Sequence, residues 1–506
     1  MDLIEYYAIG VGAGFCLLLV GMSVVLIRAL CAPAGRRLRR MLNPLLPTWA
    51  CGRIIISMQE ATLLCVILTI NGLCVGVNVR DGVSEVAKRL GRVALVNLVP
   101  ISCGAHMNYV ISICGIRLDQ YARLHAWLGG IVIVEVTLHT IFGRGAIHDI
   151  AGLLASCSVW IIGVVSIPII RRWVFELFTK LHTVSAAVAL FALWLHLPSS
   201  TFYTRPRLYL LLSLFIFILT KFVRLLNIIY SSVSLRGKSI ALVERQGDGV
   251  EIRIRMARPL KFKAGQYIYL SLWGLSKLSA LEFHPFQICW DYPDESGHQI
   301  LVLLVQPRKG FTKSLLTSAS YQEYLAFVEG PYGRPLSLGQ YGTVLLLATG
   351  VGITGQLPYV KELLKLYLQC EVKTRRIALF WEVESEVHRY WVRKWMDELL
   401  ALDRDYILDI QLYIKAHFLS SRASKGDVEK LGSHGRITLT YATMRPNIII
   451  ASEMERRKGK TLVSLCTNPS TTRVITDILE HAAHTDVDVK RLDFQPWTTK
   501  VTEVRF

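Results

Sequence analysis

Several common features are missing from this chain of 506 residues. Its eleven cysteines include no Cys-x-x-Cys pair, and eight of them lie within the first 160 residues, so the pattern indicates buried free thiols rather than a disulfide framework. There is no low-complexity segment and no nucleophile or acid–base pair of a recognisable catalytic motif. Catalytic side chains of the hydrolytic kind are therefore not expected.

Acidic residues are scarce as well. The 38 Asp and Glu residues are outnumbered by 57 Lys and Arg residues, which gives a formal net charge of +19. Such a surplus occurs in nucleic-acid-binding proteins, but this chain is 52% hydrophobic, and its long uncharged runs lie in the first 230 residues. Basic loops beside an anionic membrane leaflet explain part of the charge. No nucleic-acid partner is therefore expected.

The uncharged runs of the first 230 residues predict membrane spans. Each run is close to the roughly 20 residues that cross about 30 Å of hydrocarbon. Pro100 falls inside the third run, where a packed helix bundle tolerates it. The seven candidate spans lie near residues 7–29, 54–77, 92–109, 120–142, 150–170, 174–197 and 206–229.

The basic segments predict the orientation of these spans. No basic residue precedes the first span, and "RRLRR" (36–40) follows it, which indicates an uncleaved span with its N-terminus outside. With seven spans, Arg171-Arg172 and 221–224 then also lie on the cytosolic side, as does everything after the last span. "TRPR" (204–207) falls outside and is the exception to the positive-inside rule.

Two of the spans carry paired histidines. His125 and His139 are separated by thirteen residues, and so are His182 and His196. On a helix this offset is about 21 Å and about 3.9 turns, so both histidines of a helix point to nearly the same face. Ionisable groups inside a membrane are usually functional, and neutral imidazole is an axial ligand of haem iron.

One alternative is that these histidines are isolated polar residues of a transporter bundle, hydrogen-bonded to neighbouring helices. Two pairs with identical spacing favour two stacked b-type haems instead, with His125 and His182 holding the inner one and His139 and His196 the outer one. Glu135 lies one turn before His139, where pairing with a neighbouring polar group is the expected role. His106 and His148 have no partner at this spacing.

The chain changes character after Tyr230. A hairpin is predicted around Gly247–Gly249, and short strands follow at 265–272, 284–290, 299–307 and 325–333. Closely spaced short strands are typical of a small antiparallel barrel. We therefore expect an α-helical transmembrane bundle over 1–230, and an antiparallel β-barrel domain over 236–336.

From Thr343 onward strands alternate with helices, which predicts an α/β domain with a parallel sheet over 342–506. The first strand, "TVLLLATG", leads into "VGITGQ", where Gly350, Gly352 and Gly355 have the spacing G-x-G-x-x-G. Glycines between a strand and a helix let a pyrophosphate approach the N–H groups at the helix start. This loop predicts nucleotide binding.

The two histidine pairs, "HPFQ" (284–287), "AGQYIYL" (264–270) and "TGVGITGQLPYVKEL" (349–363) together resemble the transmembrane ferric reductases of fungi, which are related to the NADPH oxidases. The resemblance covers nearly the whole chain beyond about residue 85. It departs from the family at "LHAWLGG", where Ala126 and Gly130 replace two arginines, and at Met107-Asn108, where the family has Arg-Asn. These departures put the surroundings of the inner haem in question.

The resemblance implies a ferredoxin-reductase-like module with FAD on the barrel and NADPH on the α/β domain. The implied flavin contacts come from "HPFQ", from Gln266-Tyr267, and from the turn "RKGFTKSL" (308–315) with flanking lysines at 309 and 313. In that turn the N–H groups of Gly310 and Phe311 and the Thr312 hydroxyl would hold the pyrophosphate. From "HPFQ" the implied residues are His284, Pro285, Phe286 and Gln287.

The implied nicotinamide-nucleotide contacts are Gly350, Gly352, Ile353 and Thr354. Cys466 resembles the family cysteine near the nicotinamide; the alternative is a buried inert thiol. Trp497 or Phe494 would stack near the flavin or pack in the core.

The choice between NADPH and NADH depends on the charges after the second strand of the α/β domain. The carboxylates of Glu382, Glu384 and Glu386 would suit the ribose 2′-hydroxyl of NADH and repel the 2′-phosphate of NADPH, whereas the positive charges of Arg375, Arg376 and Arg389 would oppose that effect. The family implies NADPH.

The expected function is electron transfer from cytosolic NADPH, through FAD and two haems, to an extracytosolic ferric or cupric complex. An iron-uptake permease or oxidase is a further candidate partner, membrane lipid is the surrounding medium, and the plasma membrane is favoured over a vacuolar membrane. An NADPH oxidase that forms superoxide is the alternative enzyme, although the equal histidine spacing favours a metalloreductase. A nucleotide-regulated transporter or channel would leave the four histidines unexplained.

Overall fold

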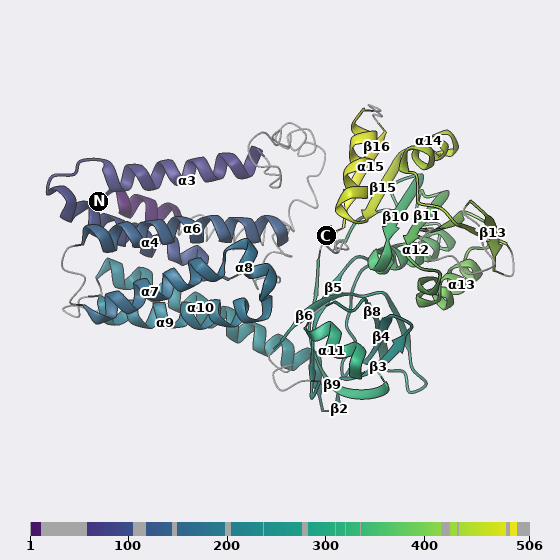
Figure 1. Cartoon of the computed structure of the whole chain (residues 1–506), viewed down its shortest axis with the longest axis horizontal. Helices are drawn as coiled ribbons and strands as arrows, with labels where there is room; N and C mark the ends of the chain where they lie inside the picture. The colour runs from purple at the N-terminus through teal and green to yellow at the C-terminus, as the bar shows by residue number, and fades with distance from the viewer. Residues whose placement is uncertain are drawn as a thin grey trace, which may run out of the picture. The chain divides into compact units, whose positions relative to one another are not determined.

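The structure is a computed structural model of the chain. It describes residues 2–11, 58–104, 118–143, 149–197, 204–235, 237–275, 282–308, 310–318, 320–333, 335–415, 426–432, 435–481 and 486–492. The chain forms two compact units, Met1–Arg224 and Leu225–Phe506, and each is described by itself (Figure 1).

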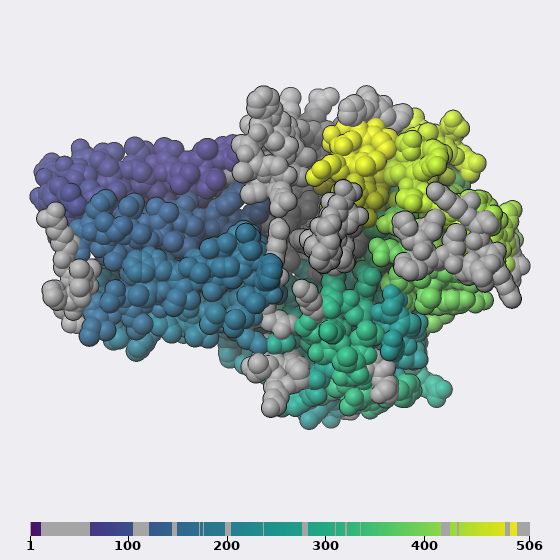
Figure 2. All heavy atoms as spheres, in the orientation of Figure 1, coloured from purple at the N-terminus to yellow at the C-terminus, as the bar shows by residue number. Residues whose placement is uncertain are grey.

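The first unit is helical. Besides a helical segment at 3–11, its helices are α3 (Met58–Gly76), α4 (Gly82–Ile101), α6 (Leu118–Phe142), α7 (Ile150–Val165), α8 (Pro168–Trp173), α9 (Phe175–His196) and α10 (Arg205–Ser232), which continues into the second unit. α4 packs along α6, and α7 packs along α9. The spaces between the ribbons of these helices in Figure 1 are filled by side chains, as the same view with all heavy atoms shows (Figure 2).

Among the described residues, three helices are long and apolar enough to cross a membrane: Tyr121–Phe142, Leu177–His196 and Arg205–Ser232. Shorter apolar helices lie at Ala61–Gly76 and Ile150–Val165. These five correspond to predicted spans. The first predicted span falls mostly outside the described residues, as does "RRLRR" (36–40).

The predicted third span, 92–109, is placed wrongly. α4 begins ten residues earlier, at Gly82, and ends at Ile101, so Pro100 lies in its last turn rather than in its interior. Glu85 explains the early start, because its carboxylate accepts the N–H groups of Arg80 (2.7 Å) and Asp81 (3.0 Å) just before the helix. The predicted fifth span is also too long, because α7 ends at Val165 and the separate helix α8 starts at Pro168.

The arginines of "TRPR" (204–207) were the exception to the predicted orientation, and in the structure both have partners. Arg205 forms an ion pair with Glu5. Arg207, only 7% exposed, donates to the carbonyl of Leu197 (3.1 Å), and its guanidinium lies 5.3 Å from the centre of the Trp194 ring. Because both arginines are paired within the helix bundle, they are weaker evidence against the predicted orientation of the spans than unpaired charges in a loop would be.

The second unit begins with a short antiparallel pair and a barrel-like sheet. The pair is β1 (Val233–Ser234) and β2 (Gly237–Lys238); the sheet contains β3 (Ile240–Gln246), β4 (Gly249–Arg255), β5 (Tyr267–Trp273), β6 (His284–Gln287), β7 (Trp290–Pro293), β8 (Gln299–Val305) and β9 (Ser320–Tyr332). Its order is β6-β5-β9-β3-β4-β8-β7, all antiparallel. The predicted hairpin is confirmed as β3 and β4. α11 (Phe311–Ser318) follows β8.

The last part of the chain is an α/β sheet with helices on both faces. Its strands are β10 (Thr343–Thr349), β11 (Arg376–Val383), β12 (Leu408–Ile414), β13 (Val428–Leu431), β14 (Ile437–Thr440), β15 (Thr461–Cys466) and β16 (Val487–Arg491), in the order β13-β14-β12-β11-β10-β15-β16. All neighbours are parallel except β13 and β14. β10 is buried along its whole length, as expected of a central parallel strand.

Two cores hold the helices against this sheet. Val344, Leu346 and Ala348 of β10 pack with α12 (Ile353–Leu368) and α13 (Arg393–Leu402) on one face. Leu345 and Leu347 pack with α14 (Pro446–Arg456) and α15 (Pro469–His481) on the other. The segment after β11 was expected as one helix, "SEVHRYWVRKWMDELLAL" (385–402), but it forms a 3-10 turn at Glu386–Trp391 followed by α13.

Candidate functional site

The four predicted histidines meet as two pairs between α6 and α9. The rings of His125 and His182 have their centres 6.1 Å apart, and those of His139 and His196 are 6.2 Å apart. The pairs join the beginnings of the two helices and the ends of the same helices. The equal spacing in the sequence therefore becomes two pairs at two depths of one bundle.

These distances fit an iron ion between the rings. A metal–imidazole nitrogen bond is about 2.0 Å, and the centre of an imidazole ring lies about 1.1 Å from its nitrogens, so two rings on opposite sides of one metal have centres about 6.2 Å apart. α6 packs most closely on α4, and α9 packs most closely on α7, rather than on each other. The distances between the paired rings, together with this packing, fit two bis-histidine haems held between α6 and α9.

The Nδ1 atoms of the two pairs are held differently. His139 Nδ1 lies 2.7 Å from the carbonyl oxygen of Ala87, and His196 Nδ1 pairs with the carboxylate of Asp149. The Nδ1 atoms of His125 and His182 are buried and have no hydrogen-bond partner among the described residues. A partner on Nδ1 leaves Nε2 as the metal-binding atom.

Glu135 has the role expected of it, which is pairing with a polar neighbour. Its two carboxylate oxygens each accept the side-chain amide of Asn97 at 3.0 Å, and both residues are buried. Asn97 in turn accepts the hydroxyl of Tyr7 at 2.5 Å. This network links α6 to α4 and to the helical segment at 3–11, beside the turn that carries His139.

The two predicted flavin segments are brought together in the barrel. The His284 ring, on β6, stacks on the Phe311 ring at 4.3 Å between centres and 20° between planes, and Phe286 lies 6.3 Å from Phe311. Gly310, at φ 61°, allows the sharp turn into α11. The Thr312 hydroxyl accepts the N–H of Arg308 at 2.9 Å, which closes that turn.

The other predicted flavin residues hold the strands in place. Gln266 donates to the carbonyl of Gly333 (3.2 Å), and the carbonyl of Gln266 accepts the side chain of Gln287 (3.3 Å). Tyr267 is 2% exposed, and its ring contacts those of Tyr269 and Tyr332. Pro285 lies opposite Tyr269 in the β5–β6 pair. In the structure these side chains support the edge that carries His284.

The predicted nucleotide loop lies between β10 and α12. A 3-10 turn covers Gly350–Gly352, and the carbonyl of Gly350 accepts the indole N–H of Trp381 at 2.8 Å. Gly350 has φ 51°, which favours glycine, and a Cβ there would meet nothing within 4 Å. The Thr354 hydroxyl donates to the carbonyl of Val351 (2.9 Å), and Ile353 is fully buried. The loop is therefore joined to β11 by Trp381 and packed into the core at Ile353.

The third glycine of the loop fits against the end of β15. A Cβ at Gly355 would lie 2.9 Å from the Leu492 side chain and 3.2 Å from the Cys466 sulfur. Ala348 and Cys466 are partners in the β10–β15 pair. Cys466 is thus beside the glycine loop, and it is only 3% exposed.

The buried environment makes an unreactive thiol the expected behaviour of Cys466. Burial raises the pKa of Cys466 to about 12, above the value of about 8.5 for an unfolded cysteine. The folded thiol therefore keeps its proton at pH 8, and stability is lost as the pH rises above about 8.5, where only the unfolded thiol ionises.

We expect iodoacetamide at pH 8 to label Cys466 in cofactor-free protein at least about tenfold more slowly than the exposed Cys370, as measured by peptide mass spectrometry. Labelling in urea should remove the difference. Equal rates for the two thiols in folded protein would contradict the buried assignment.

Two of the three acidic residues at the end of β11, Glu382 and Glu386, are paired in the structure, whereas Glu384, directly after the strand, is exposed. The Glu382 carboxylate is 4% exposed; it accepts the N–H of Met444 (2.8 Å) and forms an ion pair with Lys415 (3.4 Å). Glu386 pairs with Arg389 at 3.1 Å.

The prediction that Arg375 and Arg376 oppose these carboxylates is wrong. Both arginines lie at the opposite end of β11 from Glu382, and a rise of 3.3 Å per residue separates Arg376 from Glu382 by about 20 Å along the strand.

Some predicted residues lie outside the described part of the chain. These are Trp497, Phe494, Lys309, His106, His148 and Met107-Asn108. Sequence reasoning also missed residues that the structure places beside the histidines, above all Asp149. An Asp directly before an apolar run is a helix N-cap signal, which could have drawn attention to it.

Three family models match the chain. They are described as "Ferric reductase like transmembrane component" (residues 90–193), "FAD-binding domain" (233–336) and "Ferric reductase NAD binding domain" (341–489). The first match includes three of the four paired histidines, all but His196, and the others contain the predicted flavin and nucleotide segments. The chain therefore has an FAD-binding domain and an NAD-binding domain after a transmembrane component.

Curated relatives agree with these matches. A "Probable cell surface ferric reductase" of Aspergillus oryzae is 26% identical over 361 residues, which are 64% of this chain and 46% of that protein. "Ferric/cupric reductase transmembrane component 2" of Saccharomyces cerevisiae is 26% identical over 304 residues, covering 55% of this chain and 40% of that protein. The chain thus spans about half or less of the length of these relatives.

A solved ferredoxin NADP+ reductase of Neisseria gonorrhoeae aligns with 51% of this chain and 99% of its own, at 13% identity and a TM-score of 0.35. The fold assignment rests instead on the strand orders given above and on the three family models.

Proposed function

Because the chain belongs to the ferric reductase family, we propose that it carries electrons from cytosolic NADPH, through FAD and two b-type haems, to a ferric or cupric complex on the other side of the membrane. The observation that carries this proposal is that two histidine pairs face each other between α6 and α9. The ring centres are 6.1 Å apart in one pair and 6.2 Å apart in the other.

The order of the cofactors follows from the chemistry that each would supply when bound. A nicotinamide supplies hydride, a flavin accepts hydride and releases single electrons, and haem iron carries one electron at a time. His125 and His182 would hold the inner haem, and His139 and His196 the outer one. The edge made by His284 and Phe311 would face the flavin, and the Gly350–Gly352 turn would receive the pyrophosphate.

We propose NADPH rather than NADH because two of the three carboxylates at the end of β11, Glu382 and Glu386, are paired with basic residues, which leaves only Glu384 to repel a 2′-phosphate. In many dinucleotide-binding domains a carboxylate after the second strand accepts the ribose 2′-hydroxyl and repels a 2′-phosphate. Here Glu382 is buried, and its charge is compensated by Lys415 and by the N–H of Met444. We expect kcat/KM for NADPH to exceed that for NADH.

The acceptor is tested by measuring chelated Fe(II) formation by the full chain in the presence and absence of superoxide dismutase. We expect NADPH-dependent iron reduction to change by less than about twofold when dismutase is added, because electrons pass directly to the ferric complex. Iron reduction that disappears with dismutase would identify dioxygen as the first acceptor and an NADPH oxidase as the function.

The family and the apolar helices make the chain an integral membrane protein. We propose the plasma membrane as its site, with the FAD-binding and NAD-binding domains in the cytosol. Extracytosolic ferric or cupric complexes would be its substrates, and an iron-uptake permease or oxidase would use the reduced metal. Antibody access to the second unit only after permeabilisation of intact cells would support this orientation.

A further inference from the structure

Asp149 connects the start of one helix to a histidine of another. It lies directly before α7, and its Oδ1 accepts the N–H of Ala151 at 3.0 Å, as an N-cap does. Its other oxygen, Oδ2, pairs with Nδ1 of His196, at the end of α9. One carboxylate therefore serves as a helix cap and as a partner of a predicted haem ligand.

Glycines bring both outer histidines against the neighbouring helices. A Cβ at Gly152 would lie 2.7 Å from His196 Nδ1 and 3.0 Å from Asp149 Oδ2, so any side chain there would push the ring away from the carboxylate. A Cβ at Gly91 would lie 3.1 Å from the His139 ring, which contacts the Ala87 carbonyl on the same helix, α4. The two outer rings are fixed by the helices behind them.

The inner pair has no comparable support. The Nδ1 atoms of His125 and His182 are buried without a hydrogen-bond partner among the described residues. A histidine that donates Nδ1–H to a carboxylate is a stronger donor through Nε2 than one that donates to nothing. Stronger donation favours the ferric over the ferrous state of a bound iron.

We propose that Asp149 is a positioning residue that fixes His196 with its proton on Nδ1, directs Nε2 to the outer haem iron, and lowers the midpoint potential of the outer haem. This inference rests on the proposed function, since it needs the outer haem.

The test uses the full chain in nanodiscs with both haems bound. Asp149→Asn keeps a hydrogen-bond acceptor and a good N-cap but removes the charge, whereas Asp149→Ser keeps the cap and cannot reach His196. Each variant is titrated with reductant at equilibrium while the haem absorbance is followed. Haem transfer to a scavenging apoprotein gives the relative affinity of each haem.

We expect one of the two midpoint potentials to rise in Asp149→Asn and to rise further in Asp149→Ser, while the other stays unchanged. In Asp149→Ser one haem should also be bound about 10–100-fold more weakly, as is usual for loss of such a partner. Glu85→Gln is the matched control. Glu85 lies two residues before Ala87 on α4, is ion-paired with Arg89, and has no hydrogen bond or ion pair with a histidine among the described residues.

Unchanged potentials in both Asp149 variants would overturn the proposal and leave Asp149 as a helix cap only. An equal shift of one potential in Glu85→Gln would also overturn it, since a general charge effect would then suffice. Absence of haem from the unaltered chain would instead contradict the proposed function itself, so the two failures are distinguishable.

Discussion

Replacing His139 with alanine is expected to remove one haem from the protein and to stop electron transfer to external iron. The His139 ring is half of the outer pair, and a single remaining imidazole, His196, cannot provide two axial ligands. Since loss of a residue that only hydrogen-bonds a metal ligand weakens metal binding about 10–100-fold, loss of the ligand itself should lower iron reduction by more than about 100-fold. Haem content per chain and chelated Fe(II) formation measure the effect.

The same variant should still reduce its flavin with NADPH at the original rate. The His284–Phe311 edge and the Gly350–Gly352 turn both belong to the second unit and do not depend on the outer pair. His298→Ala, an exposed histidine on a barrel loop, is the control and should keep both haems. If His139→Ala also loses flavin reduction in well-folded protein, the proposed order of cofactors is wrong.

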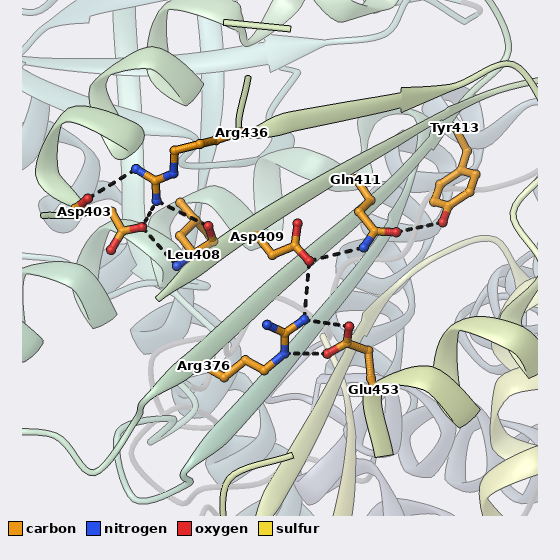
Figure 3. Close-up of polar contacts among 8 residues, drawn as sticks. All are labelled: Arg376, Asp403, Leu408, Asp409, Gln411, Tyr413, Arg436 and Glu453. Carbon is orange, nitrogen blue, oxygen red and sulfur yellow. Dashed lines mark hydrogen bonds and ion pairs between the residues drawn. The ribbon is translucent and has the colours of Figure 1, made fainter. Parts of the chain in front are cut away.

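The largest loss of stability in the second unit is expected from Glu453→Met. Glu453, on α14, is 2% exposed and binds the Arg376 guanidinium through two hydrogen bonds of 2.7 Å each (Figure 3). Arg376 also reaches Asp409 at 3.3 Å. Removing one partner of a buried ion pair leaves the other charge uncompensated, which costs about 3–5 kcal/mol of unfolding free energy.

This loss is measured by urea-dependent pulse proteolysis of the full chain. Lys460→Met is the matched control, because it breaks an ion pair with Asp488 that is much more exposed and should change the unfolding free energy by less than about 1 kcal/mol. The double variant Arg376→Met with Glu453→Met should recover part of the loss. Equal effects of Glu453→Met and Lys460→Met would show that the buried pair is not important for stability.

The figure also explains why one face of β12 is polar although helices cover the sheet. Asp409, Gln411 and Tyr413 alternate along the strand and hydrogen-bond one another, with Asp409 to Gln411 at 3.2 Å and Gln411 to Tyr413 at 2.9 Å (Figure 3). Burial, with Asp409 and Glu453 nearby, raises the pKa of Tyr413 to about 12. The tyrosine therefore stays neutral, and its hydroxyl remains a donor.

The parts of the fold that depend on local patterns could be predicted from the sequence. The offset of fourteen residues is a property of a single helix, so the common face of His125 and His139 followed from helical pitch alone. The β3–β4 hairpin followed from the glycines at 247 and 249, which flank Asp248, and the glycine loop followed from the strand before it.

The parts of the fold and of the site that depend on contacts between distant segments could not be predicted from the sequence. Asp149 and His196 are 47 residues apart, and their contact exists because α7 packs along α9. The pairing of Glu382 with Lys415 and Met444 joins three different segments around the sheet. The error at 92–109 had a different origin, since hydropathy favoured the uncharged residues and ignored the local Glu85 cap that starts α4.

Whether the four histidines hold two haems that NADPH reduces through the flavin is tested by a reduced-minus-oxidised spectrum of the purified full chain, supplied with FAD and NADPH under nitrogen, together with a haem assay per chain. We expect two b-type haems per chain and their full reduction by NADPH, which should fail without FAD. A well-folded protein without haem absorbance would overturn the assignment of the histidines.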